Sequence, residues 1–194
     1  MSGVGDRRAL ILTRAAELFA RKGIGATTVR EIADAVGVLS GSLYHHFASK
    51  DAIVSEVLAG YLDTIRARYA EVRSSGKNPT DCLRELVLVS LQVAEQQPNP
   101  TAIYQNELHY LREQRQFAEI QAAAADVQAT WLQVIEAGVA DGSFRDDIPP
   151  RVFHRLIRDA VWLSVRWHRP DGSYPTTQFA DDVTSVFLQG YVPR

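Results

Sequence analysis

Cysteine is almost absent from this chain of 194 residues, which holds a single one, Cys82. One cysteine cannot form an intramolecular disulfide and does not make a thiolate metal cluster, so both kinds of stabilised fold are excluded. Cys82 lies in a helical stretch, and we interpret it as a small buried apolar residue. The scarcity of cysteine also fits a reducing compartment.

Long apolar runs are also lacking, since none is long enough to span a bilayer. The first ten residues, MSGVGDRRAL, have no apolar core of the kind that defines a signal peptide. We therefore expect no membrane partner and a cytoplasmic location.

Catalytic signatures are missing as well: there is no glycine-rich phosphate loop after a strand, no G-x-S-x-G and no H-E-x-x-H. His109, His154 and His168 have no partner at metal-ligand spacing, and we interpret them as solvated or satisfied surface histidines. His45 and His46 are adjacent, so they cannot chelate one ion from a helix. We expect no catalytic residue, no metal and no cofactor.

No convincing β alternation occurs, and the apolar spacing predicts an all-α fold of about nine helices. Breaks rich in Gly, Pro, Ser and Asn fall at 74–79, 97–100, 141–143 and 169–173. Between them we predict helices over 6–22, 28–36, 40–47, 51–74, 117–140, 150–169 and 175–190.

The most informative stretch is 27–50, TTVREIADAVGVLSGSLYHHFASK. Thr28 with Glu31 predicts a capping box, and apolar residues at i, i+3, i+4 and i+7 predict one buried face. Gly37 suits a left-handed helix end, and Ser40 is the predicted N-cap of a second helix. The stretch therefore predicts a helix, a tight turn and a short helix.

The second helix of that stretch separates apolar from polar side chains. Leu43 and Phe47 are expected to point inward, whereas hydroxyls and imidazoles point outward, where they can bond phosphate or base edges. Lys50 adds a cation at its end. From pattern alone the stretch predicts either a DNA-reading helix–turn–helix or an ordinary pair of surface helices.

The formal net charge of −2 at first argues against a nucleic-acid partner. Residues 1–50, however, hold seven basic and four acidic side chains, whereas the rest holds 14 and 19. Attraction to phosphate is a local field, so the basic end can still bind DNA. The small excess predicts non-specific binding that salt abolishes easily.

A second pattern lies in the predicted helix 150–169, where four arginines and a tryptophan recur at steps of three and four: Arg155, Arg158, Trp162, Arg166 and Arg169. Such a stripe repels itself unless anions lie nearby, and these can come from neighbouring helices, a second copy or a phosphorylated ligand. From pattern alone a salt-bridged interface between copies is favoured over a ligand site.

Residues 15–53, AAELFARKGIGATTVREIADAVGVLSGSLYHHFASKDAI, resemble the DNA-binding domain of the TetR family of bacterial repressors. AELF, the G-x-x-x-T-T/V step, the IA-x-x-x-GV turn and Y-x-HF-x-SK are all present. The resemblance implies a DNA-binding domain over 5–65, with the helix–turn–helix at 28–47, and a ligand-binding and dimerisation domain over 66–194. It implies that Thr28, Ser42, Tyr44, His46 and Lys50 touch DNA, and we add Ser40, Leu43 and His45 to the predicted DNA-binding set.

The body is similar to an actinobacterial subgroup of that family, that of the second ketosteroid regulator. The similarity is carried by IYQNE at 103–107 and LIRDAVWLSVRWHRPDG at 156–172. In that subgroup the effector is a CoA thioester of a partly degraded steroid, which implies that Arg158, Trp162 and Arg166 meet the ligand. Asn106 replaces an expected acid, which leaves the acyl group open.

Three more residues are weaker candidates for the effector site. Tyr104 and Glu107 belong to a predicted helical face with Ile103, Leu108 and Leu111, and Trp131 lies in the predicted helix 117–140. The default interpretation of all three is core packing.

The resemblance implies a homodimer that binds a palindromic DNA operator through two half-sites. It places the dimer contact in the helices 150–169 and 175–190 as a four-helix bundle. The apolar set expected there is Phe179, Val183, Val186, Phe187 and Tyr191. Two other functions stay open: a TetR-type regulator of a drug or fatty acid whose arginines are structural, and a small helical enzyme or adaptor.

Overall fold

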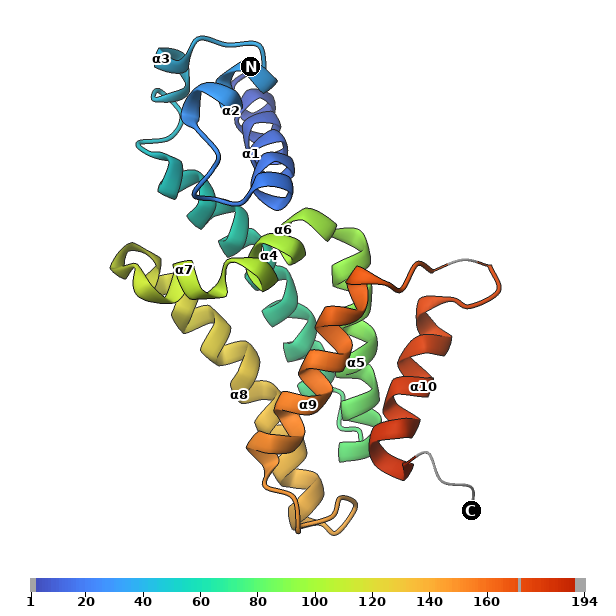
Figure 1. Ribbon diagram of the computed structural model, residues 1–194. Coiled ribbons are helices and arrows are strands. Elements are labelled where there is room, and N and C mark those ends of the chain that lie inside the picture. The colour runs from blue at the N-terminus through green and yellow to red at the C-terminus, as the bar shows by residue number, and fades with distance from the viewer. Residues whose placement is uncertain (1–2, 171, 191–194) are drawn as a thin grey trace. The chain divides into compact units, whose positions relative to one another are not determined.

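The computed structural model describes residues 3–170 and 172–190, and every regular element among them is a helix (Figure 1). The all-α prediction is confirmed, with ten α-helices and two 3₁₀ helices in this described part where about nine helices were expected. No helix within these residues is long and apolar enough to cross a membrane. Tyr191, one of the expected dimer residues, lies outside the described residues.

The chain divides into two compact units. Unit 1 comprises Met1–Leu62 and Asn99–Ala123, and unit 2 comprises Asp63–Pro98 and Ala124–Arg194. The second segment of unit 1 was expected in the body, and polar contacts explain its place. Tyr110 and Gln116 both donate hydrogen bonds to the carboxylate of Asp51, at 3.3 and 2.9 Å.

Unit 1 begins with the first three helices of the predicted DNA-binding domain, which we call the head. These are α1 (Gly3–Lys22), α2 (Val29–Ala35) and α3 (Ser40–Leu43), followed by the first half of α4 (Lys50–Ser74). The second segment of unit 1 adds α6 (Pro98–Asn106), α7 (Leu108–Glu113), η1 (Arg115–Phe117) and the first turns of α8 (Ala118–Ala140). The head is built on a core of Ile11, Phe19, Ile24, Ile32, Leu43 and Phe47.

The capping predictions for α2 are confirmed. The Thr28 side chain accepts a hydrogen bond from the Glu31 backbone N–H at 3.2 Å, and the Glu31 carboxylate accepts one from the Thr28 N–H at 2.9 Å. Gly37 has a φ of +69°, the left-handed conformation expected of it. These groups fix both ends of the helix that precedes the turn.

The prediction for the next helix is wrong in two respects. Its N-cap is Leu39 and not Ser40, because the Leu39 carbonyl accepts the Ser42 N–H at 2.9 Å while the Leu39 backbone is extended. The helix also ends at Leu43, one turn long, and Tyr44–His46 form a turn closed by the bond from the Phe47 N–H to the Leu43 carbonyl at 3.0 Å. Residue propensity favours serine as an N-cap, but the backbone becomes helical at Ser40, so the residue before it is the cap.

The segment after α5 contains a break that periodicity missed. Glu107 lies between α6 and α7 with φ −108° and ψ 14°, so the predicted helical face from Ile103 to Leu111 is interrupted there. The cause is visible in unit 1: the Glu107 carboxylate accepts a hydrogen bond from the Ile24 backbone N–H at 3.3 Å. A tertiary contact therefore overrides the local pattern.

Unit 2 contains the rest of α4 and α8, together with α5 (Pro79–Gln96), α9 (Pro150–Leu163), η2 (Ser164–Arg166) and α10 (Thr176–Gln189). α10 packs along α5 and α9 (Figure 1). Asn78 caps α5 by accepting the Asp81 N–H at 2.9 Å, and Pro150 opens α9 as predicted. Cys82 is buried as expected, and this burial raises the pKa of its thiol.

α9 is shorter than the predicted helix 150–169. After Leu163 the chain tightens into η2, where the Ser164 hydroxyl donates to the Val161 carbonyl at 2.6 Å. Arg169 then donates to the carbonyls of Val165 and His168, at 2.7 and 2.9 Å. The arginine stripe is therefore not one continuous helical face.

Candidate DNA interface and effector residues

The recognition segment, residues 39–47, presents a surface without Lys, Arg, Asp or Glu side chains. Tyr44 is 55% exposed, Ser42 and His45 are exposed, and Ser40 and His46 are half-buried. Hydroxyl and imidazole groups in such positions can donate to phosphate oxygens or bond base edges. Thr28 is exposed as well, although its hydroxyl is shared with the capping box.

Two of the residues predicted to contact DNA have side chains that turn towards the head itself. Leu43 is only 1% exposed, because α3 turns its side chain into the core of the head, where it supports the recognition element. Lys50 also turns inward: its Nζ donates to the carbonyls of Ile24 and Thr27, at 2.6 and 3.0 Å. Its ammonium group ties the loop before α2 to the start of α4.

Other cations of the head are engaged in the same way. Arg7 donates to the Val36 carbonyl at 3.3 Å and Arg8 to the His46 carbonyl at 2.6 Å, while the Arg8 guanidinium lies 4.1 Å from the Phe47 ring centroid. These carbonyls lie at or beside helix ends, where cations are favoured. Three further cations are in ion pairs: Arg14–Glu17, Lys22–Glu31 and Arg30–Asp34. Most cations of the head thus bond backbone carbonyls or carboxylates of the head itself.

The capping box of α2 has an electrostatic consequence. The hydrogen bond from Lys22, followed by those from the Thr28 backbone and hydroxyl, lowers the pKa of Glu31 to about 2. The carboxylate is therefore ionised at any physiological pH and stays available as a cap acceptor. It also lies at the positive end of the α2 dipole.

Two of the effector candidates lie in unit 1. Glu107 is committed to the Ile24 backbone, and a β-carbon on Gly23 would come within 2.8 Å of its carboxylate oxygen. Tyr104 packs its ring 5.9 Å from that of Tyr61. Glu107 is therefore placed as a residue that docks α6 and α7 on the loop after α1.

Trp131, the third of the weaker effector candidates, lies in the core of unit 2. It is 1% exposed, and its indole N–H donates to the Tyr69 hydroxyl at 2.9 Å. That hydroxyl bonds Ser90 Oγ, and the Ser90 hydroxyl donates to the Leu86 carbonyl at 2.6 Å. The chain of hydroxyls joins α4, α5 and α8 and leaves the indole no open donor.

The three residues implied by the arginine motif are divided between two elements. Arg158 and Trp162 lie one turn apart on α9, half-buried and buried respectively, whereas Arg166 is exposed on η2. Arg158 donates two hydrogen bonds to one oxygen of the adjacent Asp159, at 2.9 and 2.5 Å. The anion that the stripe required is thus supplied in part by its own helix.

The histidine interpretation is confirmed for His109, which is exposed and lies 3.3 Å from Glu113, and wrong for His154. His154 is buried with its ring 6.0 Å from that of Trp131. Burial, and then the nearby Arg158 charge, lowers its pKa to about 4, so the ring is neutral near pH 7. Apolar spacing along α9 puts it on the inner face with Ile157 and Val161, a signal that periodicity could have given.

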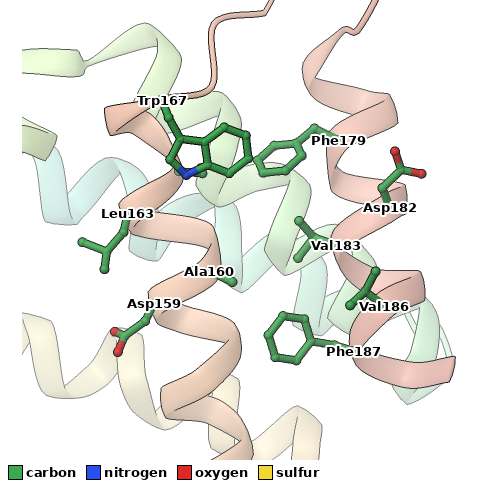
Figure 2. A pocket seen from close by; sticks show the side chains of 10 residues that line it. Asp159, Ala160, Leu163, Trp167, Phe179, Asp182, Val183, Val186 and Phe187 are labelled. Carbon is green, nitrogen blue, oxygen red and sulfur yellow. The ribbon is translucent and has the colours of Figure 1, made fainter. Parts of the chain in front are cut away.

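An apolar groove of about 320 Å³ runs between α9 and α10. Trp167 and Phe179 meet at one end, with ring centroids 5.3 Å apart, and Val183, Val186 and Phe187 project from α10 towards α9 (Figure 2). Of its lining residues, Leu163, Trp167 and Val186 are exposed, and Val152 and Leu156 are exposed earlier on α9. This is the surface expected to form the dimer contact.

One strongly exposed apolar residue beside α3, Leu39, was not singled out from the sequence. Leu39 was not among the predicted contacts, yet it is 80% exposed in the turn before α3. Because Ser40 was predicted as the N-cap, Leu39 was assigned to the turn before the helix and was not considered as a contact residue.

Two family profiles match the chain. The one described as "Bacterial regulatory proteins, tetR family" matches residues 11–57, and "Tetracyclin repressor-like, C-terminal domain" matches residues 76–191. The chain therefore belongs to the TetR family and is a TetR-type, ligand-responsive transcriptional repressor, not an enzyme.

Within the family, the predicted similarity to ketosteroid regulators is confirmed. The chain is 43% identical to the transcriptional repressor KstR2 of Rhodococcus jostii (strain RHA1) over 189 residues, which cover 97% of this chain and 93% of the relative. The solved structure of the ketosteroid transcriptional regulator KstR2 of Mycobacterium tuberculosis matches with a TM-score of 0.87 and 39% identity, covering 100% and 99% of the two chains.

A more distant solved structure is AibR in complex with isovaleryl coenzyme A and operator DNA. It matches with a TM-score of 0.83 over 95% of this chain and 100% of AibR. At 22% identity the likeness shows a shared fold alone.

Proposed function

We propose that two copies of this chain bind a palindromic operator, repress transcription in the cytoplasm at the nucleoid, and leave the DNA when a CoA thioester binds. The thioester would be that of a steroid ring-degradation intermediate. The observation that carries the DNA half is the exposed neutral surface of the recognition segment, held on a head whose charged groups are used internally. One short helix offers too few contacts for specific affinity, so two half-sites are needed.

The apolar face of α9 and α10 supports the dimer. Val152, Leu156 and Leu163 recur along α9 at steps of four and seven and remain exposed. Burying such side chains is worth about 25 cal/mol per Å² of apolar surface, which favours association with an equal face of a second copy. The two copies would then place two α3 helices on one operator.

The effector half is supported by Arg158 and Trp162. A half-buried guanidinium and a buried indole one turn apart can take a phosphate and a flat or branched apolar group. The similar M. tuberculosis protein is a ketosteroid regulator, which favours a steroid acyl group for this chain. AibR, at 22% identity, was solved with an acyl-CoA.

A second candidate is a TetR-type regulator of another apolar molecule, such as a drug or fatty acid, whose arginines are structural. The bonds from Arg158 to Asp159 and from Arg169 to backbone carbonyls favour this alternative. The two candidates differ in whether the CoA moiety contributes to binding.

Thermal unfolding with matched ligands separates these candidates. A steroid-derived CoA thioester should raise the unfolding midpoint more than its free acid, since ligand binding to the folded state stabilises it by mass action. Equal stabilisation by acid and thioester would reject the CoA effector and favour the second candidate. Arg166→Met should keep operator binding and lose release by the thioester, whereas Tyr44→Ala should lose operator binding and keep the ligand.

Sedimentation of a charged variant tests the dimer. Leu156→Asp should shift the chain from dimer to monomer and abolish operator binding, because a carboxylate would be buried without a partner. Gln133→Asp, an exposed position on α8, is the matched control and should stay dimeric. A dimeric Leu156→Asp variant would place the interface elsewhere.

A further inference from the structure

Leu39 occupies a position where a polar residue would be more stable. It is the N-cap of α3, and its side chain makes no capping hydrogen bond. Serine, threonine, aspartate or asparagine at an N-cap satisfies a free backbone N–H that leucine leaves to water. Leucine here also leaves most of its apolar surface in water, since it is 80% exposed. Neither capping nor packing in the head accounts for it.

The side chains around Leu39 differ from it in chemistry. Ser40, Ser42 and Tyr44 carry hydroxyls, and Leu43, the other leucine of the segment, is buried in the head core. The exposed hydroxyls can bond base edges and phosphates. The serine hydroxyls are not suited to the one apolar feature of the major groove, the C5 methyl group of thymine, so Leu39 and the ring of Tyr44 are the exposed apolar groups of this segment that can contact it.

We propose that Leu39 reads a thymine in each half-site by packing its isobutyl group against the C5 methyl. The proposal rests on the DNA-binding part of the proposed function and adds a specificity-determining residue to it. The contact removes two apolar groups from water at once, and it discriminates thymine from cytosine at that position because cytosine lacks the methyl group. Non-specific binding, which depends on phosphate contacts, does not use it.

The test removes only the methyl group. A duplex is first selected from a randomised library by the full-length wild-type chain, and each of its thymines is then replaced by deoxyuridine. At one symmetric pair of positions, wild type should lose roughly fourfold in affinity per half-site, the value of one methyl group. Leu39→Ala should bind the thymine and uracil duplexes equally. Leu10→Ala, an exposed leucine on α1, should behave as wild type does.

A second variant separates reading from folding. Leu39→Ser should raise the midpoint of thermal unfolding, since it supplies the missing cap, and should still lose the thymine preference. A purely structural leucine would give the opposite result, a lower midpoint with the preference retained.

Two other outcomes are informative. Equal loss on deoxyuridine substitution in wild type and Leu39→Ala would overturn the proposal, as would insensitivity of wild type at every thymine. If no duplex is enriched at all, sequence-specific DNA binding itself fails, and the failure is then of the proposed function and not of Leu39 alone.

Discussion

The two units place their polar and apolar groups in opposite ways. In unit 1, charged side chains bond to the backbone of their own unit, as Arg8 and Lys50 do, and the surface of the recognition segment is neutral. In unit 2, polar groups such as Trp131 and His154 are buried, and α9 exposes the apolar side chains of Val152, Leu156 and Leu163. Charged groups of the head therefore stabilise the conformation of the head, whereas unit 2 exposes apolar side chains to solvent.

This difference separates two sources of DNA affinity. Cations that bond carbonyls fix the angle of the recognition element but release no counterions from DNA. Under the function proposed above, sequence reading depends on hydroxyl, imidazole and leucine side chains. The small basic excess noted in the sequence therefore overstates the number of phosphate contacts.

The largest expected effect is on the core of unit 2. Trp131→Ala should cost about 3–5 kcal/mol in the free energy of unfolding, because it leaves a large cavity and removes the donor to Tyr69. Trp131→Phe should cost about 1–2 kcal/mol, the loss of one buried hydrogen bond, as measured by urea denaturation. A Trp131→Phe variant of normal stability with weakened effector binding would return Trp131 to the ligand site.

The next effect distinguishes a structural cation from a phosphate contact. Lys50→Met should destabilise the head by about 1.5–3 kcal/mol, because two carbonyls lose a charged donor. The slope of log affinity for operator DNA against log salt should stay unchanged. Arg21, an exposed cation on α1, provides the control: Arg21→Met should leave stability within about 0.5 kcal/mol of wild type. A slope reduced by about 1 in Lys50→Met would show that Lys50 touches phosphate after all.

The sequence predicted local features well wherever one short-range interaction decides them. The Thr28–Glu31 capping box, the left-handed Gly37 and the proline that opens α9 all depend on residues within a few positions. The inward direction of Leu43 also followed from spacing, although Leu43 was included in the predicted DNA-binding set as well.

What the sequence could not predict depends on contacts between distant residues. Lys50 bonds carbonyls 23 and 26 positions away, and Glu107 bonds a backbone N–H 83 positions away and ends a helix in doing so. Periodicity contains no information on such pairs. The N-cap prediction for Ser40 was wrong for a related reason: residue propensity does not determine at which of two neighbouring residues the helix begins.

His154 gives unit 2 a smaller, pH-dependent effect. Its folded pKa of about 4 lies below the unfolded value near 6.5, so between these values the unfolded state binds a proton that the folded state does not. Stability should therefore fall as pH drops from about 6.5 to 4, by at most about 3 kcal/mol, and lose nothing more to this group below that range. His154→Phe should flatten the dependence in urea unfolding at successive pH values. An unchanged pH profile in that variant would mean that other groups titrate.

The smallest effect belongs to the capping box of unit 1 and has a different pH window. The pKa of Glu31 is lowered to about 2 from 4.5, so its contribution is complete above about 4.5 and is lost as pH falls towards 2. Because this carboxylate lies at the surface, salt should weaken the effect. Glu31→Gln keeps a capping acceptor without the charge, so its unfolding midpoint should fall less than that of wild type between pH 5 and pH 3. Glu136→Gln, an exposed position on α8, should follow wild type. If Glu31→Gln also follows wild type, hydrogen bonding alone stabilises the start of α2, and the charge of Glu31 does not contribute. The charged groups that stabilise unit 1 are then its arginines and Lys50.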